Sequence, residues 1–196
     1  TIAVLDSGVD KTHPWFTTGG SKVVSEACYS STTANSLSVC PGGVTSSTAA
    51  GSGVNCSGAV SGCDHGTHVA GIAAGNNGVG PNYGVARGAD VIAIQVFSQK
   101  NSQSDCGSRP APSLIAFDAD IISALERVYE LRDDHNIAAV NMSLGGGQYF
   151  DQATCDAANP AMKIAIDNLR SVAIATVASA GNDEYRNSIK YPACIS

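Results

Sequence analysis

The chain has 196 residues and a formal net charge of −6, and only 14% of its residues are charged, against about 25% in typical soluble proteins. This length suits one domain with a sizeable hydrophobic core. The acidic balance argues against nucleic-acid binding, which usually needs a basic face, and no apolar run is long enough for a membrane span.

Two elements are predicted in the first third of the chain. TIAVLD, residues 1–6, has the pattern of a buried strand that ends at Asp6, and Gly8 permits a sharp turn after it. HGTHVAGIAAG, residues 65–75, predicts a helix rich in small residues that ends near its last glycine.

From residue 89 onward, apolar runs alternate with helical patterns. The runs that predict buried strands are ADVIAIQVF, IAAVNMSLGGG and VAIATVASAGN, the last two ending in turn-forming residues. FDADIISALERVYELRDD places Ile121, Leu125 and Val128 at helical spacing, with acidic residues near its start. NPAMKIAIDNLRS has Pro160 at a position favoured in the first turn of a helix. Strands that alternate with helices predict a parallel α/β sheet.

Seven cysteines occur in the chain, none of them in a CxxC pair. Disulfides in a secreted protein explain this number better than a zinc site does, and buried free thiols are the alternative. Because the count is odd, one thiol is free or has its partner outside the chain. Residues 30–62 contain no charged side chain, and we interpret them as a surface insertion tied by Cys40, Cys56 and Cys63 rather than as a disordered linker.

Polar residues follow three predicted strands at their carboxyl ends. They are Asp6, the stretch 141–147 and Asn182, and His65 begins a helix that can point at the same edge. Ligands of open α/β sheets bind at this edge, so we expect these groups to lie close together.

His65 and Asp6 have the chemistry of a general base and the carboxylate that orients it. The side-chain amide of Asn182 can donate a hydrogen bond to a developing oxyanion. Taken singly, a solvated aspartate or an asparagine in a turn would explain these residues better. His68 lies one helical turn after His65, but a third ligand and the glutamate of metalloprotease helices are missing, so we predict no metal site here and a structural role for His68.

Four motifs, DSGVD, HGTHVAG, NMSLGG and ASAGN, occur in this order, each at the end of a predicted element. Together they resemble the subtilisin-like serine proteases, the subtilases or peptidase S8 family, over the whole chain. The resemblance implies a parallel, mostly doubly wound sheet with helices on both faces. It also implies that Asp6 and His65 are two members of the catalytic triad and that Asn182 is the oxyanion-hole amide.

The same resemblance implies two substrate-binding segments. The segment expected to pair with the substrate backbone consists of Ser143, Leu144 and Gly145. The wall of the main specificity pocket is expected at Ser179, Ala180 and Gly181. Small residues there leave room for a large side chain, so we expect a preference for apolar or aromatic residues.

The chain departs from the family pattern in one important respect. The Gly-Thr-Ser-Met-Ala block that carries the subtilase nucleophile does not occur in it. We therefore expect residues 1–196 to be a single catalytic domain that is incomplete at its C-terminus, with the nucleophilic serine and a partner for Cys194 beyond the chain end. We expect no hydrolysis by this chain alone.

No cofactor is required by this chemistry. Structural calcium occurs in subtilases, and GNNGVGPNYGV lies where one site often forms. Gly78 stands where a ligating asparagine would be expected, so we assign no metal.

The leading hypothesis is a secreted serine endopeptidase that cleaves polypeptides by acyl transfer, with a propeptide or the rest of the same domain as a partner. The alternative is an inactive pseudoprotease fragment that grips peptides by β-augmentation through residues 143–145. Retention of Asp6, His65 and Asn182 favours the enzyme, because binding alone needs none of them. A third hypothesis, a disulfide-stapled structural domain, leaves HGTHVAG unexplained.

Overall fold

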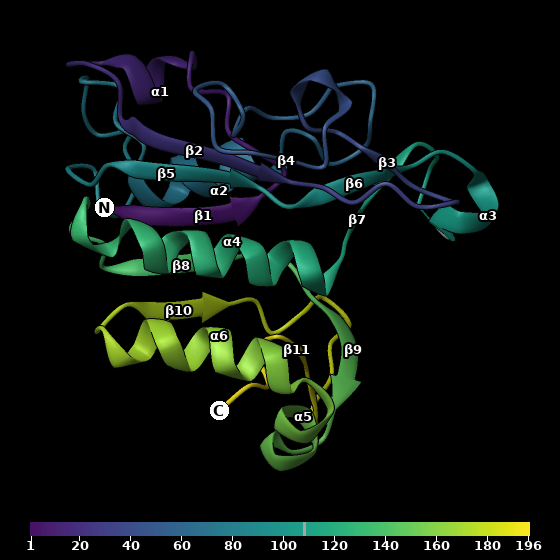
Figure 1. Ribbon diagram of the computed structural model, residues 1–196. Coiled ribbons are helices and arrows are strands. Elements are labelled where there is room, and N and C mark those ends of the chain that lie inside the picture. The colour runs from purple at the N-terminus through teal and green to yellow at the C-terminus, as the bar shows by residue number, and fades with distance from the viewer. Residues whose placement is uncertain (108) are drawn as a thin grey trace.

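The computed structural model describes residues 1–107 and 109–196. Its centre is a six-stranded sheet in the order β10-β8-β1-β5-β2-β4 (Figure 1). The strands are β1 (Ile2–Asp6), β2 (Val23–Tyr29), β4 (Ser46–Ser47), β5 (Val91–Gln95), β8 (Ala139–Met142) and β10 (Ala175–Ala178). Every pair is parallel except β2 with the short edge strand β4. The predicted parallel α/β fold is confirmed.

Helices cover both faces of this sheet. Helix α2 (His65–Ala74) packs on one face, and α4 (Asp118–Glu130) and α6 (Pro160–Ser171) pack on the other. Strand β1 contributes side chains to the hydrophobic clusters on both faces of the sheet, because successive side chains of a strand point to opposite faces. Val4 belongs to the cluster beside α2, whereas Leu5 belongs to the larger cluster beside α4 and α6.

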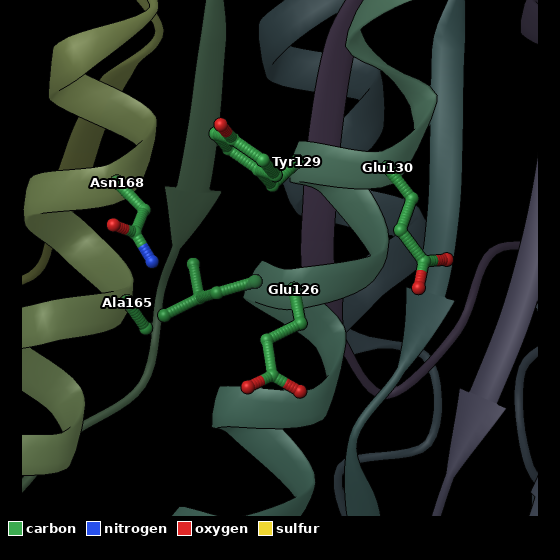
Figure 2. Close-up of a pocket in the computed structure, with 6 residues that line it drawn as sticks. Glu126, Tyr129, Glu130, Ala165 and Asn168 are labelled. Carbon is green, nitrogen blue, oxygen red and sulfur yellow. The ribbon is translucent and has the colours of Figure 1, made fainter.

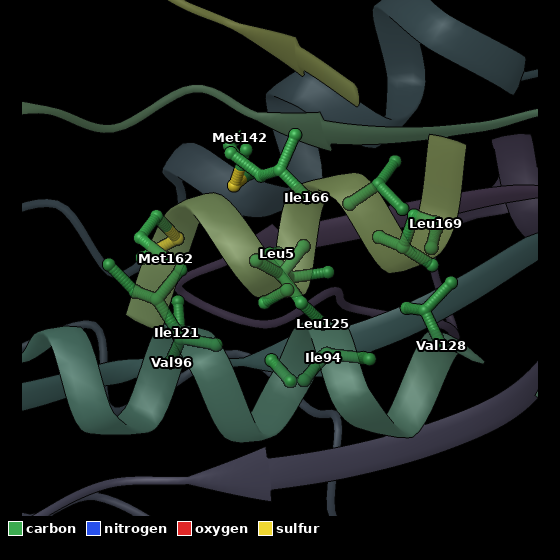
Figure 3. Close-up of a cluster of buried hydrophobic side chains, with 14 of the residues drawn as sticks. Leu5, Ile94, Val96, Ile121, Leu125, Val128, Met142, Met162, Ile166 and Leu169 are labelled. Atoms are coloured by element: carbon green, nitrogen blue, oxygen red, sulfur yellow. The ribbon is translucent and has the colours of Figure 1, made fainter. Parts of the chain in front are cut away.

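The larger core confirms the helical spacing predicted for α4. Ile121, Leu125 and Val128 are at most 3% exposed and face Met162, Ile166 and Leu169 of α6, together with sheet residues (Figure 3). Burying an aliphatic side chain of this size stabilises the fold by about 1.5–3 kcal/mol. This packing holds α4 and α6 against the face of the sheet opposite α2.

The remaining elements are short. A three-stranded antiparallel sheet contains β3 (Leu37–Ser38), β6 (Phe97–Lys100) and β7 (Ser113–Ala116), and β9 (Gly146–Tyr149) pairs with β11 (Ile189–Tyr191). The short helices are α1 (Pro14–Thr17), α3 (Gln103–Cys106), α5 (Gln152–Ala158) and the 3₁₀ turns η1 (Pro41–Gly43) and η2 (Leu131–Asp133).

The single strand predicted for ADVIAIQVF is wrong at its end. Strand β5 stops at Gln95, and β6 begins at Phe97 in another sheet. The side-chain oxygen of Gln95 accepts the N–H of Phe97 at 2.6 Å. This local bond takes a donor that a continuing strand would present to its neighbour. The glycine-rich loop predicted after β8 is also shorter than expected, because β9 starts at Gly146.

The disulfides correct one further expectation. Cys194 bonds to Cys155 of α5, so the prediction of a partner beyond the chain end is wrong. Their Cα atoms lie 6.0 Å apart, within the normal span of a disulfide, because the C-terminal segment runs beside α5. Of the seven cysteines, all within the described part of the chain, the buried Cys106 is the free one.

Residues 30–62 are tied to the rest of the molecule at both ends. Cys40 bonds to Cys28 of β2, and Cys56 bonds to Cys63 just before α2. Strand β3 of this segment pairs with β6, and β4 extends the central sheet. The segment therefore contributes one strand to each of two sheets.

The topology brings the predicted polar groups to one edge. Strands β1 and β8 are neighbours in the sheet. Strands β2 and β5, which follow β1 in the sequence, lie on one side of this pair, and β10, which follows β8, lies on the other. Such a reversal of strand order places a crevice at the carboxyl ends of the strands. In the described part of the chain, no helix combines the length and the apolar character needed to cross a membrane.

Candidate active site

His65 and Asp6 meet at this edge. Asp6 is the last residue of β1 and is 1% exposed, and His65 is the first residue of α2. The Nδ1 atom of His65 lies 2.8 Å from Asp6 Oδ1 and 3.0 Å from Oδ2. The imidazole side chain is half exposed, so its other nitrogen, Nε2, remains available to a bound molecule.

The electrostatics of the pair follow from this contact. The hydrogen bond from His65 to Asp6 raises the pKa of the imidazole above its ordinary value. Partial burial opposes this rise, and the negative charges of Asp6 and Asp64 add to it. Asp6 thereby favours the tautomer with the proton on Nδ1 and stabilises the imidazolium that would form when Nε2 takes a proton.

A cleft of about 770 Å³ opens beside the pair. Most of the predicted site residues line it, namely Asp6, His65, Ser143, Leu144, Gly145, Ser179, Gly181 and Asn182. Ala180 is not among the described residues that line the cleft. Asn182 is exposed on the loop after β10, on the same side of the sheet as His65.

The two predicted substrate-binding segments hold each other in place. The hydroxyl of Ser179 donates to the carbonyl oxygen of Leu144 at 3.1 Å, and its N–H donates to the carbonyl of Met142 at 3.1 Å. Gly181 has a φ of 104°, which favours glycine, and a Cβ there would meet the Lys190 side chain at 2.6 Å. The two loops therefore form one connected wall of the cleft.

The β6–β7 hairpin contributes a wall that the sequence interpretation missed. Phe97, Leu114, Ile115 and Ala116 line the cleft, as does the free Cys106 of α3. The apolar run SLIA at 113–116 was a signal for a further strand, but it lies in a polar stretch and is only four residues long.

A second, smaller hollow lies between α4 and α6 (Figure 2). It measures about 260 Å³ and is lined by Leu125, Glu126, Tyr129, Glu130, Ala165 and Asn168. It shares no residue with the cleft, and none of these side chains is a histidine, cysteine or serine. The histidine–carboxylate chemistry therefore lies in the cleft.

His68 does not join the pair. It is exposed on α2, one turn after His65. Within residues 1–107 and 109–196, no three His, Cys, Asp or Glu side chains come together in a group that could hold a metal ion.

The comparisons with known proteins agree with this architecture. The model of the subtilase family matches residues 1–196, and the chain belongs to this family. It is 32% identical over 129 residues to the subtilisin-like proteinase Mp1 of Magnaporthiopsis poae, covering 66% of this chain and 26% of that protein. It is 34% and 37% identical over 119 residues to subtilisin-like protease 3 of Arthroderma otae and of Trichophyton equinum, each match covering 61% of this chain and 24% of the relative. The chain thus spans about a quarter of the length of these relatives.

Proposed function

We propose that this chain supplies the general base, its orienting carboxylate and the substrate cleft of a serine endopeptidase. The observation that carries the proposal is the contact of His65 Nδ1 with the buried carboxylate of Asp6, at the mouth of a cleft large enough for a peptide. Membership of the subtilase family supports serine protease chemistry for such a pair.

The mechanism we propose is acyl transfer. His65 takes the proton of a serine hydroxyl through Nε2 as the hydroxyl attacks the peptide carbonyl, and later gives that proton to the leaving amine. Asp6 holds the ring and stabilises its charged form. Asn182 donates its amide N–H to the oxyanion, a contribution of roughly 3 kcal/mol to transition-state stabilisation, a magnitude known from this family itself.

The serine nucleophile is proposed to come from outside the 196 residues, because no Gly-Thr-Ser-Met-Ala block occurs among them. By this proposal the chain alone binds peptides without cleaving them. The three disulfides support an extracellular location, since such bonds persist in oxidising compartments. Polypeptides are the proposed substrates, and a propeptide or the rest of the domain is the proposed partner.

Two experiments test the proposal. The first reads the coding sequence beyond Ser196 for a Gly-Thr-Ser block, and a gene that stops at Ser196 would leave only the peptide-binding alternative for this chain. The second expresses the form that carries the block and measures peptide hydrolysis. Asp6→Asn should lower kcat by about 10⁴-fold, because the imidazole then takes the wrong tautomer.

The matched control for the second experiment is His68→Gln, which changes an exposed histidine on the same helix and should leave kcat unchanged. A fluorophosphonate probe should label the form with the block and leave the 196-residue chain unlabelled. Stoichiometric labelling of the 196-residue chain would contradict the placement of the nucleophile.

A further inference from the structure

Ser7 occupies an unusual place beside the catalytic pair. It follows Asp6 directly, is fully buried, and contacts the backbone on both sides of His65. Its hydroxyl donates to the carbonyl oxygen of Cys63 at 3.3 Å and accepts the N–H of Gly66 at 2.9 Å. Its own N–H donates to Asp6 Oδ1 at 2.7 Å.

The hydroxyl of Ser7 replaces a helix cap. The first N–H groups of a helix have no partner within the helix, and a side chain at the N-cap usually satisfies one of them. Asp64, the N-cap residue of α2, makes no such hydrogen bond. The N–H of Gly66 is satisfied by Ser7 instead, from a different element of the fold.

A second observation shows that the start of α2 is held unusually close to the loop after β1. A Cβ built on Gly66 would lie 2.3 Å from the carbonyl oxygen of Gly8 and 3.1 Å from the Asp6 side chain. Only glycine allows this approach, and the hydrogen bonds of Ser7 lie directly beside it. The segment 63–66 therefore has a defined position relative to Asp6.

We propose that Ser7 is a positioning residue for His65, and this inference rests on the function proposed above. Its hydroxyl fixes the backbone before and after His65, while its N–H fixes the carboxylate that His65 meets. One residue thus sets both halves of the Nδ1–carboxylate contact. The role differs from that of Asp6, which touches the imidazole, because Ser7 acts on the ring only through the backbone.

The test uses the 196-residue chain itself and needs no turnover. The pKa of His65 is measured by NMR titration in the wild type, Asp6→Asn, Ser7→Ala and Ser7→Thr, and hydrogen exchange of the Gly66 amide is measured in the same samples. Ser52→Ala is the matched control, because Ser52 is also buried, at 3% exposure, and its hydroxyl has no hydrogen-bond partner among the described residues.

We expect Ser7→Ala to lower the pKa of His65 toward its value in Asp6→Asn and to speed exchange of the Gly66 amide at least tenfold. Ser7→Thr, which keeps the hydroxyl, should restore the pKa of His65, and Ser52→Ala should leave both quantities at the wild-type values. If Ser7→Ala does not fold, the test rests on Ser7→Thr. The pKa of His65 and the exchange rate of the Gly66 amide must then match the wild type, and a difference in either would overturn the positioning role.

The outcomes separate the two proposals. A wild-type pKa of His65 no higher than that in Asp6→Asn would overturn the catalytic pair itself. A wild-type pKa in Ser7→Ala, together with faster exchange at Gly66, would leave the pair intact and overturn the positioning role. An equal fall in the pKa of His65 in Ser52→Ala would also overturn the positioning role, because the effect would then follow from the loss of any buried hydroxyl.

Discussion

The disulfide between Cys155 and Cys194 should contribute more to stability than the one between Cys56 and Cys63. The first joins residues 39 apart in sequence, and the second joins residues only 7 apart. A crosslink lowers the entropy of the unfolded chain more when it closes a longer loop. For these two loops the stabilisation is about 4 kcal/mol and about 2.5 kcal/mol respectively, so the expected difference is about 1.5 kcal/mol.

Replacing each pair with alanine gives a clean comparison, since all four cysteines are nearly or fully buried and alanine leaves no unpaired hydroxyl behind. Urea unfolding followed by far-UV circular dichroism gives the free energy of unfolding of each variant. We expect the double variant at 155 and 194 to lose about 1.5 kcal/mol more than the double variant at 56 and 63.

A smaller loss for the 155–194 variant than for the 56–63 variant would refute this reasoning. It would mean that the loop before α2 gains stability from its crosslink through native contacts rather than through the unfolded state. The variant that keeps all three disulfides but replaces the free Cys106 with alanine is the control for removing a buried sulfur. This variant should lose less free energy of unfolding than either double variant.

Three further predictions concern the cleft and the pair formed by His65 and Asp6. Because the pKa of His65 is higher in the folded chain, the stability that its protonation contributes is fully present below the unfolded pKa of about 6.5 and is lost as pH rises through the folded value. As pH rises from the unfolded to the folded pKa of His65, the urea midpoint should therefore fall in the wild type and in His68→Gln, and should fall less in Asp6→Asn. The same pH dependence of the midpoint in all three proteins would contradict the His65–Asp6 contact. Gly66→Ala should destabilise the chain by about 1–3 kcal/mol in urea unfolding, because its Cβ meets the backbone of Gly8, whereas Gly58→Ala, with open space around it, should change stability by less than about 0.5 kcal/mol. Labelled peptides with an apolar or aromatic residue facing residues 179–181 should bind at least tenfold more tightly by fluorescence anisotropy than peptides with a charged residue there, and tighter binding of the charged set would contradict the small-walled pocket.

Much of the fold could be predicted because its signals are local. The buried strand ending at Asp6, the α2 helix starting at His65 and the apolar spacing of α4 each follow from a few consecutive residues. The convergence of Asp6 with the residues that follow the other strands was predictable as well, since the carboxyl ends of parallel strands meet at one edge of the sheet. His65 was expected there because it begins a helix that can point at the same edge.

The misses have a different physical origin. Disulfide partners are set by which segments come side by side, and nothing in the local sequence of Cys194 indicates α5. At the break after β5, the side chain of Gln95 accepts the N–H of Phe97, and such a local side-chain hydrogen bond cannot be read from an apolar pattern. The cleft wall from β7 follows from long-range pairing with β6, and residues 101–112 separate the two strands.

The contact between His65 and Asp6 shows how a pair of residues far apart in sequence acquires a precise geometry. A histidine at a helix start moves with the first turn of that helix. Here the first turn is fixed twice, by the absence of a Cβ at Gly66 and by the hydroxyl of Ser7, and both constraints lie within one residue of the pair. The motifs DSG and HG therefore supply the Asp6 carboxylate and the His65 imidazole and also the small residues beside them. Their small residues bring the backbones together, and this approach turns a carboxylate and an imidazole into a hydrogen-bonded pair.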